Sequence, residues 1–238
     1  MIRVIRADIR RILKKVMFYI ICLIGYLIMF STKKADTAID QIELIKIAMV
    51  LIGSALFPIA VFIFVYGDEF KAGVIHSIIG RGMSRAKIVT AKYIDCLILQ
   101  LICTIPLLLI GYIKNAISGL PISPQQNLDL FWSFIIMYLE SAGCLAFGTM
   151  ALFLTLSVAG GMVTLITFIM VVSDALRKIQ DYIPLRVYDF YYEGLVEKAK
   201  ADILVGSVPW QLIPAIAIYI VGVLILTGVL FDRKELDL

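Results

Sequence analysis

Six long runs of apolar residues constrain the fold of this chain more than any other feature of its sequence. They cover residues 16–30, 47–66, 93–113, 131–156, 162–173 with the residues flanking them, and 209–231. A helix needs roughly 17–25 mostly apolar residues to cross the hydrocarbon core of a bilayer. The stretch 130–173 is too long for one crossing, and its segment Ser157-Val158-Ala159-Gly160-Gly161 predicts a hairpin. The sequence therefore predicts an all-α polytopic membrane protein with six transmembrane helices, in a single transmembrane domain over residues 1–238.

The overall composition agrees with a bilayer as the solvent. Hydrophobic residues make up 61% of the chain and charged residues 17%, with a mean hydropathy of +0.98. Soluble domains are about 45–50% apolar. Pro58 and Pro106 fall inside the second and third runs, and we expect kinks there, which neighbouring helices tolerate in a membrane.

Lysine and arginine are distributed unevenly between the connecting segments. Thirteen lie in residues 1–15, 67–92 and the C-terminal tail, against eight on the other side, which are Lys33, Lys34, Lys114 and five in the segment 175–208. Short cytoplasmic loops carry the excess of basic residues, and the first span usually decides the orientation. We therefore expect a multi-pass protein of the cell (plasma) membrane with both termini in the cytoplasm.

The first fifteen residues form an amphipathic pattern with a helical period. One stripe of about 100° holds the apolar side chains, and basic residues occupy the rest; the stripe consists of Ile2, Ile5, Ile9, Ile12, Leu13 and Val16. Such a helix lies in the membrane interface, with its cations toward anionic headgroups. We expect an elbow helix over residues 1–15, which either only sets the topology or also lies beside a cytoplasmic partner.

Residues 67–92 form a short basic connection with more structure than a simple linker needs. Its five lysines and arginines against two acids give a net charge of +3. The spacing predicts a helix over 70–79 with one apolar face made by Phe70, Val74, Ile78 and Ile79. The following Gly80-Arg81-Gly82 ends that helix, and Ser84 is placed to cap the next one. The segment is predicted to be a cytoplasmic docking surface.

The connection 175–208 is predicted to be a long outer loop before the sixth span. It is neutral, with five basic and five acidic residues, and carries Tyr182, Tyr188, Phe190, Tyr191 and Tyr192. Aromatic rings favour the headgroup level of a membrane. Residues 187–204 are expected to include a short amphipathic helix, either in a vestibule that contacts substrate or in a simple capping structure.

Ionisable residues inside a membrane are functional candidates by default. Glu140 lies near mid-depth in the fourth run, so it either lines a translocation path or pairs with a neighbouring helix. Gln100, in the inner half of the third run, is a second candidate for the path. Asp95 and Asp174 lie near the ends of runs, where we expect them to be solvated or to snorkel to the interface.

Several kinds of chemistry are missing from the sequence. It has no G-x-x-x-x-G-K-[ST] phosphate loop and a single histidine, His76, so we assign no catalytic residue and no metal ligand. The four cysteines lie in or at the edge of the apolar runs and predict no disulfide framework. The basic residues are juxtamembrane, so a membrane surface or a protein explains them better than nucleic acid does.

The connection 67–92 carries a likeness to a known family. An acidic pair, an aromatic residue and a glycine follow the second span. After a break, Ser-Arg and a lysine open the third span. The residues that carry this pattern are Leu56, Phe57, Asp68, Glu69, Phe70, Lys71, Ala72, Gly73, Arg81, Gly82, Met83, Ser84, Arg85, Ala86, Lys87, Ile88 and Lys92. This pattern resembles the first cytoplasmic loop of type-2 ATP-binding-cassette (ABC) exporter permeases. The likeness extends to the architecture: an elbow helix, six spans, a long outer loop before the last span and a short charged tail.

The resemblance implies a permease subunit that binds no cofactor itself and works beneath two separate ABC ATPase subunits, which bind ATP and Mg²⁺. It implies a second permease subunit, identical or related, and export of an amphipathic or hydrophobic substrate such as a peptide. By the same resemblance, the helix 70–79 is the coupling helix seated in a cleft of the ATPase, and Glu69 and Arg85 fix its angle. The residues placed at the ATPase contact are Asp68, Glu69, Phe70, Gly73, Val74, Ile78, Arg81, Ser84, Arg85 and Lys87.

Two other classes of function remain open at this stage. One is a non-transporting membrane protein, such as a sensor or an immunity factor that sequesters a toxin through the outer loop. The other is a secondary transporter, which predicts internal repeats with broken helices at mid-membrane. No half-to-half repetition is evident in the sequence.

Overall fold

Helices account for all the regular secondary structure in the described part of this computed structural model, which comprises residues 1–32, 36–71, 83–120, 123–172, 175–176, 178–179, 188, 191–204 and 207–234. In chain order they are α1 (Ile2–Ile12), α2 (Val16–Ser31), α3 (Ala38–Val50), the π-helical η1 (Leu51–Leu56), α4 (Phe57–Lys71), α6 (Arg85–Ser118), α7 (Pro124–Thr155), α8 (Val158–Thr167), the π-helical η2 (Phe168–Val172), α11 (Tyr192–Leu204) and α12 (Leu212–Arg233).

Four helical segments among the described residues are each long and apolar enough to cross a membrane: residues 38–68, which join α3, η1 and α4, and the helices α6, α7 and α12. The pair α1 and α2 passes the same test together, although it is bent by 72° between its two helices. The segment Val158–Val172 is apolar but shorter. The described residues thus form an all-helical protein with four or five apolar helices of membrane-spanning length. The crossing number of six and the interfacial position of α1 stay predictions.

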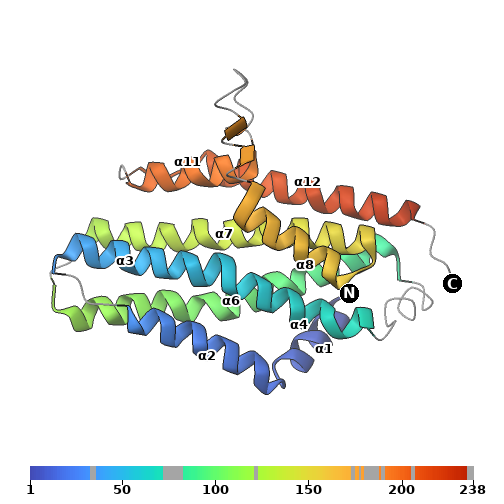
Figure 1. Cartoon of the computed structure of the whole chain (residues 1–238), viewed down its shortest axis with the longest axis horizontal. Helices are drawn as coiled ribbons and strands as arrows, with labels where there is room; N and C mark the ends of the chain where they lie inside the picture. The colour runs from blue at the N-terminus through green and yellow to red at the C-terminus, as the bar shows by residue number, and fades with distance from the viewer. Residues whose placement is uncertain are drawn as a thin grey trace.

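The long helices lie side by side, and their ends gather at two poles of the bundle (Figure 1). One pole, called the basic end here, contains α1, the end of α4, the start of α6, the turn between α7 and α8, and the end of α12. Three contacts join these segments: Lys15 with Asp68, Arg85 with the last carbonyls of α12, and the Lys234 ammonium donating to the Leu154 carbonyl. Helix α1, the end of α12 and the flanks of the connection 67–92 therefore share one end of the molecule.

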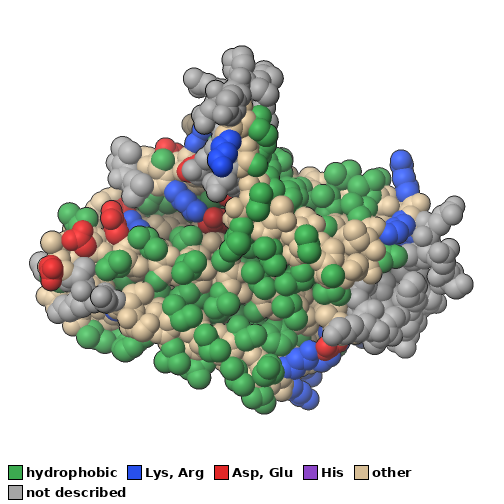
Figure 2. Space-filling view, viewed as in Figure 1, with side chains coloured by type: hydrophobic (Ala, Val, Ile, Leu, Met, Phe, Trp, Pro, Cys, Tyr) green, Lys and Arg blue, Asp and Glu red, His purple; other side chains and the backbone are tan. Residues whose placement is uncertain are grey.

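The surface has the distribution of polarity that a bilayer requires. Figure 2 shows hydrophobic side chains over the middle of the visible face, with charged side chains mainly toward its two ends and over its upper part. Large apolar side chains are exposed along α2 and α12, for example Leu23, Leu27, Ile218 and Ile225. Such a belt is stable against lipid but costly against water.

The hairpin predicted within residues 130–173 is confirmed, with its turn slightly earlier than the glycine pair. Leu156 ends α7 in the left-handed conformation, and the Ser157 hydroxyl caps α8 by accepting from the Gly160 N–H at 3.4 Å. Gly161 lies inside α8, where an added Cβ would lie 2.5 Å from the ring of Phe62. The glycine therefore allows α8 to approach α4 closely.

The distortion expected near Pro58 takes the form of the π-helical segment η1. In this segment the Phe57 N–H donates to the Ile52 carbonyl, five residues earlier. At the same spacing the Gly53 carbonyl would need an N–H at position 58, which proline lacks. The buried Gln100 of α6 supplies that donor, with its Nε2 2.6 Å from the Gly53 oxygen. A side chain from another helix thus completes the backbone that the proline interrupts.

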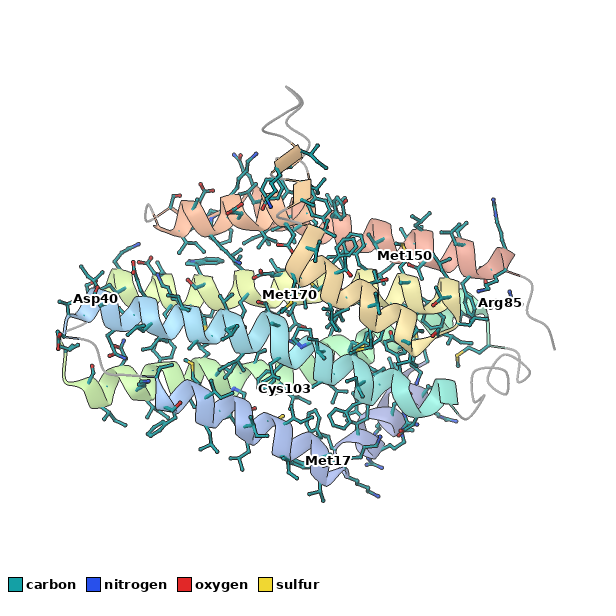
Figure 3. All side chains as sticks on the ribbon, in the orientation of Figure 1. Met17, Asp40, Arg85, Cys103, Met150 and Met170 are labelled. Atoms are coloured by element: carbon teal, nitrogen blue, oxygen red, sulfur yellow. The ribbon has the colours of Figure 1, made fainter. Side chains whose placement is uncertain are left out.

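Pro106 is accommodated inside α6 without ending the helix, which continues from Arg85 to Ser118. The Tyr26 hydroxyl of α2 donates to the Cys103 carbonyl, three residues before the proline, at 3.0 Å. All four cysteines are free and buried; Cys103, labelled in Figure 3, lies with its Sγ 3.5 Å from that of Cys22.

The contact between Gln100 and Gly53 leads to a double-mutant prediction. We expect Gln100→Leu to lower the free energy of unfolding by about 1–3 kcal/mol, because a buried carbonyl loses its donor. In a Pro58→Ala background the loss should be smaller, because the substituted alanine restores a backbone N–H near that carbonyl. Chemical denaturation in detergent micelles measures both, with the exposed Gln125→Leu as the control. Equal losses in the two backgrounds would contradict this account of the π-helical segment.

Candidate functional site

The candidate site consists of the described flanks of the connection 67–92 and the contacts that hold them. Asp68 lies exposed near the end of α4, and Glu69 and Phe70 continue its helical backbone. Ser84 occupies the N-cap position of α6 in an extended conformation, although its side chain makes no capping hydrogen bond, and Lys87 is exposed one turn later. Most of the predicted helix 70–79, including Gly73, Val74 and Ile78, lies outside the described residues, as does Arg81.

Arg85 fastens the start of α6 to the end of α12 (Figure 3). Its Nη1 donates to the carbonyls of Phe231 at 3.0 Å and Asp232 at 3.4 Å, and also to that of Lys234. The guanidinium carbon lies 5.5 Å from the centroid of the Phe231 ring. The last carbonyls of a helix lack intrahelical donors and carry partial negative charge, so a cation is favoured there. The observed partners of Arg85 are therefore on α12.

The other flank is held at the bend between α1 and α2. The Lys15 ammonium forms an ion pair with Asp68, and it also lies 5.7 Å from the centroid of the Phe64 ring. Both charged side chains are partly exposed, at 29% and 57%. An isolated pair of this kind contributes roughly 1 kcal/mol or less, so its main effect is on position.

A more deeply buried charge cluster joins α1 to α6. Lys92 Nζ lies 2.7 Å from Asp8 Oδ2 and 3.9 Å from Asp95 Oδ2, and Arg11 Nη2 lies 3.8 Å from Asp8 Oδ1. The Lys92 side chain is 2% exposed and that of Asp95 is fully buried. Charges in such surroundings persist only in opposed sets, because each alone would have to be removed from water without compensation.

This cluster corrects the expectation that Asp95 is solvated. Asp95 lies near the end of the third apolar run, where placing a charge at the edge of the membrane costs little free energy. In the structure α1 packs against α6 at this level and contributes the Asp8 carboxylate to Lys92. The sequence pattern could not reveal the contact between Asp8 and Lys92, because these residues are 84 positions apart in the chain. Asp174, for which the same expectation was stated, lies outside the described residues.

Taken together, α1 is joined to both helices that flank the connection 67–92. Lys15, at the bend where α1 leads into α2, pairs with α4, and Asp8 within α1 pairs with α6. Through Arg85, α6 is in turn joined to α12. A displacement of either flank must therefore move α1 or α12, or break a charged contact.

Glu140 pairs with a neighbouring helix, which was one of its two predicted roles. The Lys200 ammonium of α11 lies 2.8 Å from Glu140 Oε2, and the Glu140 side chain is 13% exposed. Nearby, the Tyr192 hydroxyl donates to the Leu139 carbonyl and accepts from the Gly143 N–H. A Cβ at Gly143 would overlap the Tyr192 ring. The glycine therefore allows α11 to pack directly on α7.

Helix α11 belongs to the segment predicted as an outer loop, yet it packs along the side of α7 (Figure 1). The amphipathic helix predicted over 187–204 is present from Tyr192 to Leu204. Gln100, proposed for the translocation path, is fully buried and uses its amide on Gly53. Its role in this structure is to complete a helix backbone.

Within the described ranges no group of three or more histidine, cysteine, aspartate or glutamate side chains could hold a metal ion. Neither a protein family nor a characterised protein matches the sequence.

The buried cluster gives a stability prediction. Lys92→Met leaves the Asp8 and Asp95 carboxylates without their shared cation, and we expect a loss of about 3–5 kcal/mol in the free energy of unfolding. Adding Asp95→Asn should recover part of the loss, because it removes one of the opposed negative charges. Denaturation in detergent micelles measures each variant, with Lys87→Met as an exposed control on the same helix. A Lys92→Met protein as stable as the control would show that the cluster carries no such energy.

Proposed function

We propose that this chain is the membrane permease subunit of an ABC exporter. It moves an amphipathic or hydrophobic substrate, such as a peptide, across the cytoplasmic membrane and is driven by separate ATPase subunits. In this proposal both termini and the connection 67–92 face the cytoplasm, α1 lies in the interface as an elbow helix, and the chain crosses the membrane six times. A second permease subunit, identical or related, completes the translocation unit.

The observation that carries the proposal is the way in which the flanks of the connection 67–92 are tied into the bundle. The connection joins two membrane-length helical segments, and its flanks are bound to α1 and α12 by Lys15, Lys92 and Arg85. A simple surface linker gains nothing from such ties. A segment that receives force from a partner needs them, because an untethered flank would absorb the displacement locally.

The source of energy is the second support. The sequence has no phosphate loop of its own. The charges found inside the bundle are paired with one another, as Lys92 is with Asp8 and Lys200 is with Glu140. Charges paired in this way hold helices together, and they are poorly suited to relay a coupling ion. We therefore place ATP and Mg²⁺ on a partner and assign this chain no catalytic residue.

The coupling residues divide into two groups in this proposal. Phe70, Gly73, Val74, Ile78 and Arg81 form the surface that the ATPase contacts. Asp68, Ser84, Arg85 and Lys87 lie at the flanks, where Asp68 and Arg85 already hold α1 and α12. Glu69 lies between the groups, next to Asp68. Movement of the contact surface would then reach the bundle through the rigid helix α6, which extends over 34 residues.

The test is a backbone change in the contact surface. Val74→Pro should abolish transport and the stimulation of ATPase activity by the permease, because proline breaks a helix interior at that position. Val74→Ala, which keeps the N–H, should retain most of both activities and is the matched control. Reconstituted vesicles containing permease and copurified ATPase provide the two measurements.

Two results would overturn the proposal. One is full transport and full ATPase stimulation in the Val74→Pro protein when it inserts in the membrane normally. The other is failure of any nucleotide-hydrolysing subunit to copurify with the intact chain. Transport that survives ATP depletion and stops with a protonophore would instead indicate a secondary transporter.

A further inference from the structure

A groove runs along the side of the bundle between α3 and α11, with α7 as its floor. Its volume is about 490 Å³, which is within the range of small-molecule sites. The walls combine two kinds of residue. Glu43, Lys46 and Lys200 contribute charge, whereas Ile47, Leu51 and Ile203 are apolar.

Glu43 and Lys46 are the charged groups at one end of the groove. They are three residues apart on α3, so they lie on the same face of the helix with Cβ atoms roughly 5–6 Å apart. Glu43 is exposed and Lys46 is half-buried. Neither side chain forms an ion pair or a hydrogen bond with another residue of the described segments. An acid and a base are thus presented side by side without partners in the part of the chain that the structure describes.

The apolar wall continues from these charges along the same helix. Ile47 and Leu51 are one turn apart and strongly exposed, at 64% and 63%. From Glu43 to Leu51 the helix rises about 12 Å, at 1.5 Å per residue. Ile203 of α11 lies on the opposite wall. The groove therefore has a charged end and an apolar channel that leads from it.

Lys200 lies on the α11 wall and differs from Lys46 in having a partner. Its ammonium is 2.8 Å from the Glu140 carboxylate, so its charge is already neutralised within the bundle. Lys46 and Glu43 are therefore the charged groups of the groove that a ligand would meet. Together they fit a ligand that carries one negative and one positive group a few ångströms apart, followed by a hydrocarbon chain.

We propose that this groove binds a phospholipid with a zwitterionic aminoalkyl phosphate headgroup. The phosphate contacts Lys46, the ammonium contacts Glu43, and an acyl chain follows Ile47 and Leu51 opposite Ile203. Glu43 and Lys46 lie on α3, which begins at the opposite pole from α1 and from Arg85 (Figures 1 and 3). This inference does not rest on an ATPase partner or on the direction of transport.

A lipid explains the groove better than a second copy of the chain does. Stable protein interfaces bury roughly 800 Å² on each partner, over a broad surface. Here the distinctive feature is an open amphipathic groove beside helices whose outward faces are apolar. A phospholipid supplies both headgroup charges and a chain from the solvent that already surrounds the bundle.

The experiment is native mass spectrometry of the intact, delipidated chain in detergent, titrated with three lipids. These are phosphatidylethanolamine, phosphatidylglycerol and diacylglycerol, which carry a zwitterionic, an anionic and an uncharged headgroup. Lys46→Gln should weaken the tightest phosphatidylethanolamine and phosphatidylglycerol sites by about tenfold, the scale of a lost charge-assisted hydrogen bond. Glu43→Gln should weaken phosphatidylethanolamine alone. Diacylglycerol should bind weakly and equally to all of these proteins.

Two further variants test whether the effects are specific to this groove. Lys178→Gln removes an exposed lysine outside the groove and should leave all three affinities unchanged. Ile47→Trp fills the apolar channel and should weaken all three lipids. Unchanged lipid binding in both Lys46→Gln and Ile47→Trp would overturn the proposal. So would equal effects of Glu43→Gln on the zwitterionic and anionic lipids. A dimer that excludes lipid and dissociates on Ile47→Trp would assign the groove to a second copy of the chain.

Discussion

The arrangement of this bundle depends on the requirement that polar groups away from water find partners. Three such groups meet partners on other helices: Gln100 meets the Gly53 carbonyl, Lys92 meets Asp8, and Glu140 meets Lys200. Apolar packing alone has little directional preference, so many pairings of apolar helices are nearly equivalent. The polar contacts make α6 a neighbour of η1 and α1, and α7 a neighbour of α11. They therefore give the bundle a specific set of neighbours.

At the basic end, charged groups nearer the surface also have partners on neighbouring helices. Arg85 donates to the last carbonyls of α12, and Lys15 forms an ion pair with Asp68. Each contact is weak alone, but they connect α1, α4, α6 and α12 around one short connection. In our proposal, a movement of the connection 67–92 is therefore transmitted to all four of these helices. Loss of one contact should loosen the linkage without unfolding the spans, which separates coupling from stability.

Local features of the sequence predicted the helices well. The apolar runs correspond to α2, α4, α6, α7, α8 and α12; the hairpin near Ser157 and the start of α6 after Ser84 follow from turn and cap residues. Long-range features were not accessible in the same way. The pairing of Lys92 with Asp8, the donor role of Gln100 and the packing of α11 on α7 each depend on a residue at least 47 positions away. Periodicity describes one helix at a time, so it cannot identify such partners. The groove beside α3 was missed for that reason too.

The two poles of the bundle differ in how their charges are used. At the basic end, Asp8, Lys92, Lys15, Asp68 and Arg85 all have partners within the chain. At the opposite pole, Glu43 and Lys46 share one face of α3 and have no partner in the described segments. If charge served only to hold helices together, these two would be expected to pair with each other or with α11, as Lys200 does with Glu140. Their separation beside an apolar channel leaves a dipole that a zwitterionic headgroup complements. Charge at one pole therefore maintains the mechanical linkage, and charge at the other is available to the lipid.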